Sequence, residues 1–143
     1  MEGNITIPYQ WTTGEATGRF LTELRDKKKI IGSKCSSCGR ILVPPQDFCA
    51  ACFINTTDWV EVGDEGVMET FTVVHKKLIW RPFDPPYAIA AIRLEGASSN
   101  LLHIVRANDY GRLKAGLKVK AHWKEERTGS IFDIDCFRTV PEV

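Results

Sequence analysis

The stretch that decides the fold is Gly32-Ser-Lys-Cys35-Ser-Ser-Cys38-Gly39, followed by Cys49-Ala-Ala-Cys52, with ten residues between Cys38 and Cys49. Each Cys-x-x-Cys pair is a tight turn that presents two sulfur atoms to one point, and Gly39 lets the first turn curl so that backbone N–H groups face the thiolates. Two such pairs supply the four ligands that fill a tetrahedral zinc shell and leave no position for water. The sequence therefore predicts a structural metal site formed by Cys35, Cys38, Cys49 and Cys52.

Other interpretations of these cysteines are two separate redox pairs or two disulfides. A thioredoxin-type pair lies next to a βαβ pattern, and no such pattern is visible around these residues. An all-thiolate shell also suits iron. We therefore expect one zinc ion per chain, with iron as the second choice. The fifth cysteine, Cys136, is expected to be a small buried apolar residue.

Residues 1–31 form the predicted N-terminal helical segment, and residues 32–62 form the predicted zinc ribbon. Thr12 or Thr13 is expected to cap the helix, and Glu15 lies three residues after Thr12, as in a capping box. The apolar positions at helical spacing are Ala16, Phe20, Leu21 and Leu24. The ribbon segment is too short and too polar for a hydrophobic core of its own, so its folding should depend on the metal.

Residues 63–143 are predicted to form an OB-fold, a closed barrel of five strands. Gly63–Gly66 is expected to be a turn before the first strand. The expected strands are Val67–His75, Tyr87–Leu94, Leu101–Val105, Lys118–Lys124 and Phe132–Cys136. In the last of these, Phe132, Ile134 and Cys136 alternate with Asp133 and Asp135. The fold class is thus mainly β with a short N-terminal helix, in which the ribbon precedes the barrel.

Composition and charge exclude several classes of protein. The chain has 143 residues, enough for one domain or two very small ones, and a formal net charge of +1. Four metal-bound thiolates and one divalent ion change that charge to −1, so the strong basic field of a nonspecific nucleic-acid binder is missing. No apolar run is long enough for a membrane helix, and the first residues do not resemble a secretory signal. We expect a cytoplasmic protein without membrane contact.

The segment from His75 to Tyr87 combines three cations, three aromatic residues and three prolines. It either wraps its own barrel and buries its aromatic residues, or it contacts a ligand or a partner. In the second case the cations could meet phosphates and the aromatic residues could stack on a base. The candidate contact residues are Lys76, Lys77, Trp80, Arg81 and Phe83. No catalytic residue can be assigned, because the sequence has no Gly-x-Ser-x-Gly, His-Glu-x-x-His or phosphate-binding glycine-rich motif.

The order of these parts resembles a family of acyl-CoA-associated proteins that was long catalogued as a domain of unknown function. The resemblance covers residues 15–140 and rests on the two cysteine pairs, Pro44-Pro45, the Phe71–Val74 strand and Pro86-Tyr87. It implies a rubredoxin-like zinc ribbon packed beside an OB-fold. It also implies association with thiolases, hydroxymethylglutaryl-CoA synthase or enoyl-CoA hydratases, with archaeal relatives acting as scaffolds between thiolase and synthase in the mevalonate route.

Three functions follow as hypotheses. The first is a non-catalytic, zinc-containing subunit that binds acyl-CoA or serves as a scaffold for a thiolase or hydroxymethylglutaryl-CoA synthase type of enzyme. The alternative is a single-stranded nucleic-acid-binding OB-fold protein, although nucleic acid is not expected as a partner at this net charge. The third is a small thioesterase-like enzyme that uses the barrel surface, for which no nucleophile can be named.

Overall fold

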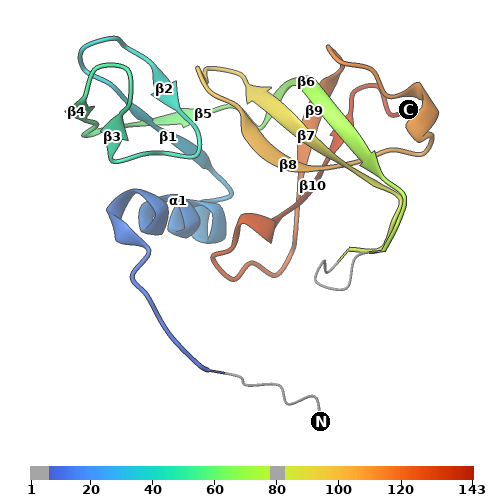
Figure 1. Cartoon of the computed structure of the whole chain (residues 1–143), viewed down its shortest axis with the longest axis horizontal. Helices are drawn as coiled ribbons and strands as arrows, with labels where there is room; N and C mark the ends of the chain where they lie inside the picture. The colour runs from blue at the N-terminus through green and yellow to red at the C-terminus, as the bar shows by residue number, and fades with distance from the viewer. Residues whose placement is uncertain (1–6, 78–82) are drawn as a thin grey trace.

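Figure 1 shows the computed structural model of the chain, in which residues 7–77 and 83–143 are described. A small ribbon of short strands stands beside a closed barrel, and one helix lies against the ribbon. No helix in the described part of the chain is long and apolar enough to cross a bilayer. The architecture is therefore mainly β with one N-terminal α-helix, as the sequence predicts.

The helix α1 spans Gly14–Lys27 and buries Ala16, Phe20 and Leu24. Its cap differs from the predicted one. Thr13 is the N-cap residue but makes no capping bond through its side chain, so the expected capping box with Glu15 is wrong. Instead Asp47, from the ribbon, accepts a hydrogen bond from the backbone N–H of Ala16 at 3.3 Å. Because this contact joins residues far apart in sequence, no local pattern could indicate it.

The ribbon consists of two small sheets. Its strands are β1 Ile30–Lys34, β2 Ile41–Leu42, β3 Phe48–Cys49, β4 Ile54–Asn55 and β5 Asp58–Val62. β1 is the centre of an antiparallel sheet of order β2-β1-β5, and β3 pairs with β4 in a separate hairpin. Three of the five strands are only two residues long, which is too short for cross-strand pairing alone to keep them together.

The barrel contains five strands, and it closes on itself in the order β10-β8-β7-β6-β9. They are β6 Glu65–Val74, β7 Tyr87–Leu94, β8 Leu101–Arg106, β9 Lys118–Trp123 and β10 Ile134–Thr139. β8 and β10 run parallel, whereas the other neighbouring strands are antiparallel. Closure leaves no free barrel edge, and the predicted five-stranded OB-fold is confirmed.

Two details of the barrel correct the sequence interpretation. Glu65 and Gly66 belong to β6, so the predicted turn is shorter than expected. Phe132 and Asp133 are not part of the last strand but of a 3-10 helix, η2, Ile131–Asp133. Asp133 is buried, because its carboxylate accepts hydrogen bonds from several backbone N–H groups of the preceding turn. Alternation with apolar neighbours was therefore misleading, since this aspartate points inward.

One hydrophobic core joins the two halves of the molecule. The cluster contains Phe20 and Leu24 of α1, Ile30 of β1 and barrel residues such as Met68 and Ile134. Arg127, which follows β9, also donates a hydrogen bond from Nε to the carbonyl of Arg25 at 2.8 Å. The ribbon has little apolar interior of its own, so α1 and β1 bury their apolar faces against the barrel.

Candidate metal centre and barrel pocket

The two cysteine pairs form matching turns. In the first, the N–H of Gly39 donates to the carbonyl of Cys35 at 2.9 Å, and in the second the N–H of Phe53 donates to the carbonyl of Cys49 at 2.8 Å. Both residues that follow a pair are left-handed, with φ of 72° at Gly39 and 56° at Phe53. Gly39 thus has the role expected from the sequence, and the second turn achieves the same curl with a phenylalanine.

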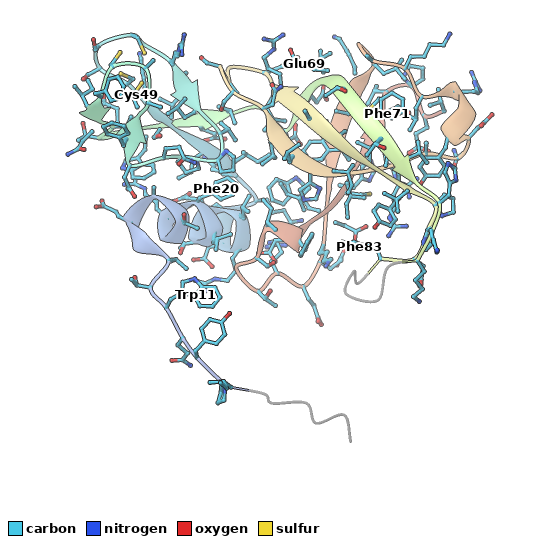
Figure 2. The ribbon with its side chains drawn as sticks, in the orientation of Figure 1. Trp11, Phe20, Cys49, Glu69, Phe71 and Phe83 are labelled. Atoms are coloured by element: carbon cyan, nitrogen blue, oxygen red, sulfur yellow. The ribbon has the colours of Figure 1, made fainter. Side chains whose placement is uncertain are left out.

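The four sulfur atoms converge on one point, and all lie within 4.8 Å of one another. The Sγ atoms of Cys38 and Cys49 are 3.8 Å apart. In a tetrahedral site with Zn–S bonds of about 2.3 Å, neighbouring sulfurs are separated by about 3.8 Å. None of the cysteines forms a disulfide, so that interpretation is not supported. The donor set and its spacing fit a single tetrahedral ion. Figure 2 shows the ribbon end with its sulfur atoms around Cys49.

Backbone N–H groups tune the sulfurs toward the ionised form that a metal needs. The N–H of Cys38 is the main cause that lowers the pKa of the Cys35 thiol to about 7, against the opposing effect of burial. At Cys38 the N–H of Arg40 also lowers the pKa, but burial and the three neighbouring thiols raise it to about 11. Four thiolates this close repel one another, and a divalent cation is the group that removes this repulsion.

The remaining cysteine is not part of this centre. Cys136 is 1% exposed and packs with Tyr87 and Ile104. Burial raises the pKa of its thiol, which keeps the sulfur protonated and unreactive. The sequence expectation of a small buried apolar residue is confirmed.

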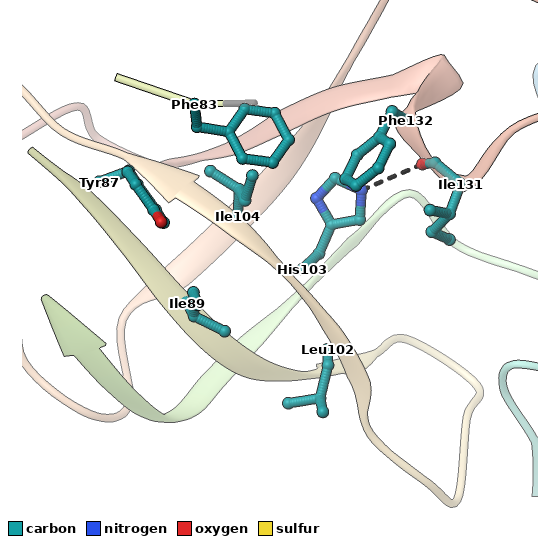
Figure 3. A pocket seen from close by; sticks show the side chains of 8 residues that line it. All are labelled: Phe83, Tyr87, Ile89, Leu102, His103, Ile104, Ile131 and Phe132. Carbon is teal, nitrogen blue, oxygen red and sulfur yellow. Dashed lines mark hydrogen bonds between the residues drawn. The ribbon is translucent and has the colours of Figure 1, made fainter. Parts of the chain in front are cut away.

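A second feature, which sequence reasoning missed, is a pocket of about 280 Å³ on the barrel (Figure 3). It lies where β7, β8 and η2 meet. Most of its lining is apolar, from Phe83, Tyr87, Ile89, Leu102, Ile104 and Phe132. The available signal was that apolar residues occupy outward positions on two neighbouring strands, at Ile89 in β7 and at Leu102 in β8.

Besides the hydroxyl of Tyr87, the pocket wall contains a polar ring, that of His103, whose side chain is buried. Its Nε2 lies 3.1 Å from the carbonyl oxygen of Ile131 (Figure 3). A carbonyl only accepts, so Nε2 carries the proton of the neutral ring. Burial is the largest cause that lowers the pKa of His103, and it favours this neutral form. The other two histidines, His75 and His122, are exposed.

The predicted contact segment is partly described. Lys76 is exposed, and Lys77 forms an exposed ion pair with Asp84, with Nζ and Oδ1 2.5 Å apart. Phe83 is half-buried and packs edge-on against Tyr87 and Phe132, with ring centroids 5.8 Å and 5.1 Å away. Phe83 therefore contributes to the pocket instead of standing free as a stacking platform. The other two candidates, Trp80 and Arg81, lie outside the described residues.

Among residues 7–77 and 83–143, the four cysteines are the one group of three or more metal-ligating side chains gathered at a point. The fold and this centre define a zinc-ribbon protein that carries an OB-fold barrel. Residues 22–55 match the family model of the ChsH2 rubredoxin-like zinc ribbon domain, and residues 59–124 match that of the ChsH2 C-terminal OB-fold domain. The chain belongs to the DUF35 family.

Three similar proteins can be compared with this chain. A DUF35 protein of unknown function from Sulfolobus solfataricus has a similar structure, with a TM-score of 0.63, 35% identity and coverage of 76% of this chain and 78% of that one. A DUF35 domain-containing scaffold protein of Methanocaldococcus jannaschii is 29% identical over 78 residues. This match spans 54% of the chain and 55% of that protein, just over half of each.

A third relative is the Ltp2-ChsH2(DUF35) aldolase, whose structure covers 90% of this chain and 95% of the matched one with a TM-score of 0.63. At 19% identity this likeness concerns the fold alone. The family models place a ribbon before a barrel, and the two solved structures share this chain's fold.

Proposed function

We propose that the chain is a non-catalytic, zinc-containing subunit that holds an acyl-CoA enzyme of the thiolase or hydroxymethylglutaryl-CoA synthase type. The observation that carries the proposal is the sequence similarity to a DUF35 scaffold protein. The zinc ribbon and OB-fold family models that match this chain support it. The Ltp2-ChsH2 neighbour, described as an aldolase, is consistent with a DUF35 chain that works beside an enzyme.

The chemistry of the metal centre supports an architectural role for the ion. Four thiolates complete the tetrahedral shell of zinc, so no coordination position remains for a water or a substrate. Zinc is preferred to iron because four cysteines in a ribbon are a common structural zinc shell, and because the matching family model describes a zinc ribbon. The ion would be held by Cys35, Cys38, Cys49 and Cys52, and it would brace the ribbon against α1.

The test is to purify the chain under gentle conditions from its native host and to identify the proteins that accompany it. A thiolase or a synthase that co-elutes with the chain, and that rebinds to it when both are purified separately, supports the proposal. Recovery of the chain alone would contradict it. Metal analysis of the same preparation should give one zinc ion per chain, and an iron content of one would contradict the choice of zinc.

Direct binding of acyl-CoA is the second part of the proposal. Lys76 and Lys77 are exposed at the start of the His75 to Tyr87 segment, where their ammonium groups can meet the phosphates of CoA. Calorimetric titration of the chain with an acyl-CoA should give weaker binding for the double variant Lys76→Glu, Lys77→Glu. Lys114→Glu is a matched control, because Lys114 is exposed elsewhere on the barrel. Equal affinity in all three proteins would remove this contact from the proposal.

A further inference from the structure

The pocket at β7, β8 and η2 contains a buried polar atom whose lost hydration is not replaced by a hydrogen bond from the described residues. His103 Nδ1 is a buried side-chain nitrogen with no hydrogen-bond partner among the residues that the structure describes. The whole His103 residue is 5% exposed, so bulk water does not satisfy this atom. An unpaired buried polar group costs about 1–3 kcal/mol. The bond from Nε2 to the carbonyl of Ile131 gives a reason for a histidine at this position, but it does nothing for Nδ1.

The tautomer of His103 determines which kind of hydrogen bond its Nδ1 atom can make. Since Nε2 donates its hydrogen to the carbonyl of Ile131, Nδ1 presents a lone pair. In Figure 3 the Nδ1 edge of the ring faces the space between Phe83 and Ile104, away from the bond to Ile131. Among the described lining residues, the pocket therefore offers the fixed acceptor of His103 Nδ1 and the hydroxyl of Tyr87, which can both donate and accept. An occupant that pairs with Nδ1 has to bring an N–H or an O–H group.

The walls define the body of the occupant. The rings of Phe83, Tyr87 and Phe132 stand around the cavity, and their mutual contacts are edge-on. Aromatic ligands gain from such edge-on arrangements. A cavity of about 280 Å³ is near the lower limit for ligand pockets, so it accommodates one or two rings and not a cofactor of the size of CoA. None of the described residues that line it carries an ionised side chain, so a charged ligand would lose its hydration without compensation from them.

We propose that this pocket is a binding site for an uncharged aromatic compound that carries one hydrogen-bond donor, of the phenol or indole class, with His103 Nδ1 as the acceptor. This site is separate from the metal centre, and it includes Phe83, one of the candidate contact residues. It does not depend on the identity of the enzyme partner.

The experiment compares phenol with toluene, which has the same shape but a methyl group where phenol has its hydroxyl. Each is titrated against the metal-loaded full chain and followed by the backbone amide resonances of β7 and β8. Phenol is expected to saturate in the millimolar range, and toluene to bind about tenfold more weakly. No saturable shift with phenol, or equal binding of the two compounds, would overturn the proposal.

Two further measurements test the role of His103. His103→Phe keeps a ring in the wall but removes the acceptor, so the preference for phenol should vanish. His122→Phe is the matched control, because His122 is exposed on β9 and should leave the preference unchanged. A preference that survives in His103→Phe would overturn the assignment.

If His103→Phe does not fold, the wild-type chain still decides through the ¹⁵N resonance of His103 Nδ1. Its shift should be that of a free lone pair in the unliganded protein and should move toward a hydrogen-bonded value with phenol but not with toluene. A hydrogen-bonded Nδ1 in the unliganded protein would mean that the acceptor is already satisfied, and the proposal would be wrong.

Discussion

The ribbon and the barrel solve the same problem, the stability of a small β-structure, by different means. The barrel closes its hydrogen bonding and buries side chains such as Met68, Ile92 and Phe137. The ribbon buries two cysteines, Cys35 and Cys49, and its strands β2, β3 and β4 have two residues each. The barrel is thus stabilised mainly by apolar burial, whereas we expect the ribbon to depend on a metal ion at its four cysteines. The hydrophobic core that α1 shares with the ribbon and the barrel connects the two halves.

The largest expected effect follows from breaking the metal centre. In Cys49→Ser a buried thiolate is lost, and with it much of the roughly 10–16 kcal/mol that a structural zinc ion contributes to folding. We expect the amide protons of residues 35–55 to lose their protection from hydrogen exchange, while those of β6 to β10 keep most of theirs. Hydrogen exchange followed by mass spectrometry, together with metal analysis, measures both.

Ser36→Ala is the matched control for this variant, because Ser36 lies in the first cysteine turn, is exposed and offers no sulfur ligand. It should retain one metal ion and full protection. A Cys49→Ser protein that stays fully protected in the ribbon would show that the metal is dispensable, and the contrast between the two halves would fail. Equal loss in the barrel would show that the shared core makes the two halves one cooperative unit.

The next effect concerns Asp133, a buried polar residue in the turn before β10. The Asp133 carboxylate accepts hydrogen bonds from the N–H groups of Thr128, Gly129 and Ser130 at 2.9, 2.8 and 3.2 Å. In Asp133→Ala these donors lose their partner, and we expect the free energy of unfolding to fall by about 3 kcal/mol. Denaturant unfolding followed by fluorescence measures the change.

Asp133→Asn separates the bonds from the charge, because its amide oxygen still accepts from this turn. It should lose clearly less stability than the alanine variant. If both variants are as stable as the wild type, the turn between β9 and β10 does not need this side chain, and the barrel is stabilised by apolar burial alone.

Asp133 also shows which structural features the sequence alone does not predict. The four cysteines, the five barrel strands and α1 could be predicted because local patterns encode them, namely a ligand spacing, alternation and a helical period. Asp133, the Asp47 cap of α1 and the pocket around His103 depend on contacts between segments that are distant in the chain or on an irregular turn. A pattern of polar and apolar letters does not distinguish a carboxylate that faces water from one that faces three backbone N–H groups.

A smaller effect is expected where two barrel strands approach each other closely. A Cβ on Gly66 would collide with the carbonyl oxygen of Arg93 on β7. Gly66→Ala should force β6 and β7 apart and lower the free energy of unfolding by about 2 kcal/mol. Gly116→Ala provides the comparison, because Gly116 has free space around it but a φ of +89°.

The Gly116 variant reports backbone strain alone, which costs about 1 kcal/mol, and thermal unfolding of both proteins gives the two values. A smaller loss in Gly66→Ala than in Gly116→Ala would mean that β6 and β7 yield to the extra methyl group. The barrel would then be more adaptable than a closed, densely packed structure allows.

The smallest effect returns to the ribbon and to the two matching cysteine turns. Phe53 holds a left-handed φ of 56° where the first turn has Gly39, and its side chain is 77% exposed. Phe53→Gly relieves the strain but loses the edge-on contact with Phe48 at 5.9 Å. The strain of about 1 kcal/mol and the aromatic contact of about 0.5–1.5 kcal/mol nearly cancel, so stability should change by less than about 0.5 kcal/mol.

Phe53→Ala keeps the strain and loses the contact, and it should therefore be less stable than Phe53→Gly in the same thermal unfolding assay. The opposite order would show that the second turn does not need the left-handed conformation. Because the metal dominates the ribbon, neither variant should change the metal content. A substitution of an exposed side chain that released the ion would mean that the aromatic pair, and not the sulfur geometry, keeps the second turn closed.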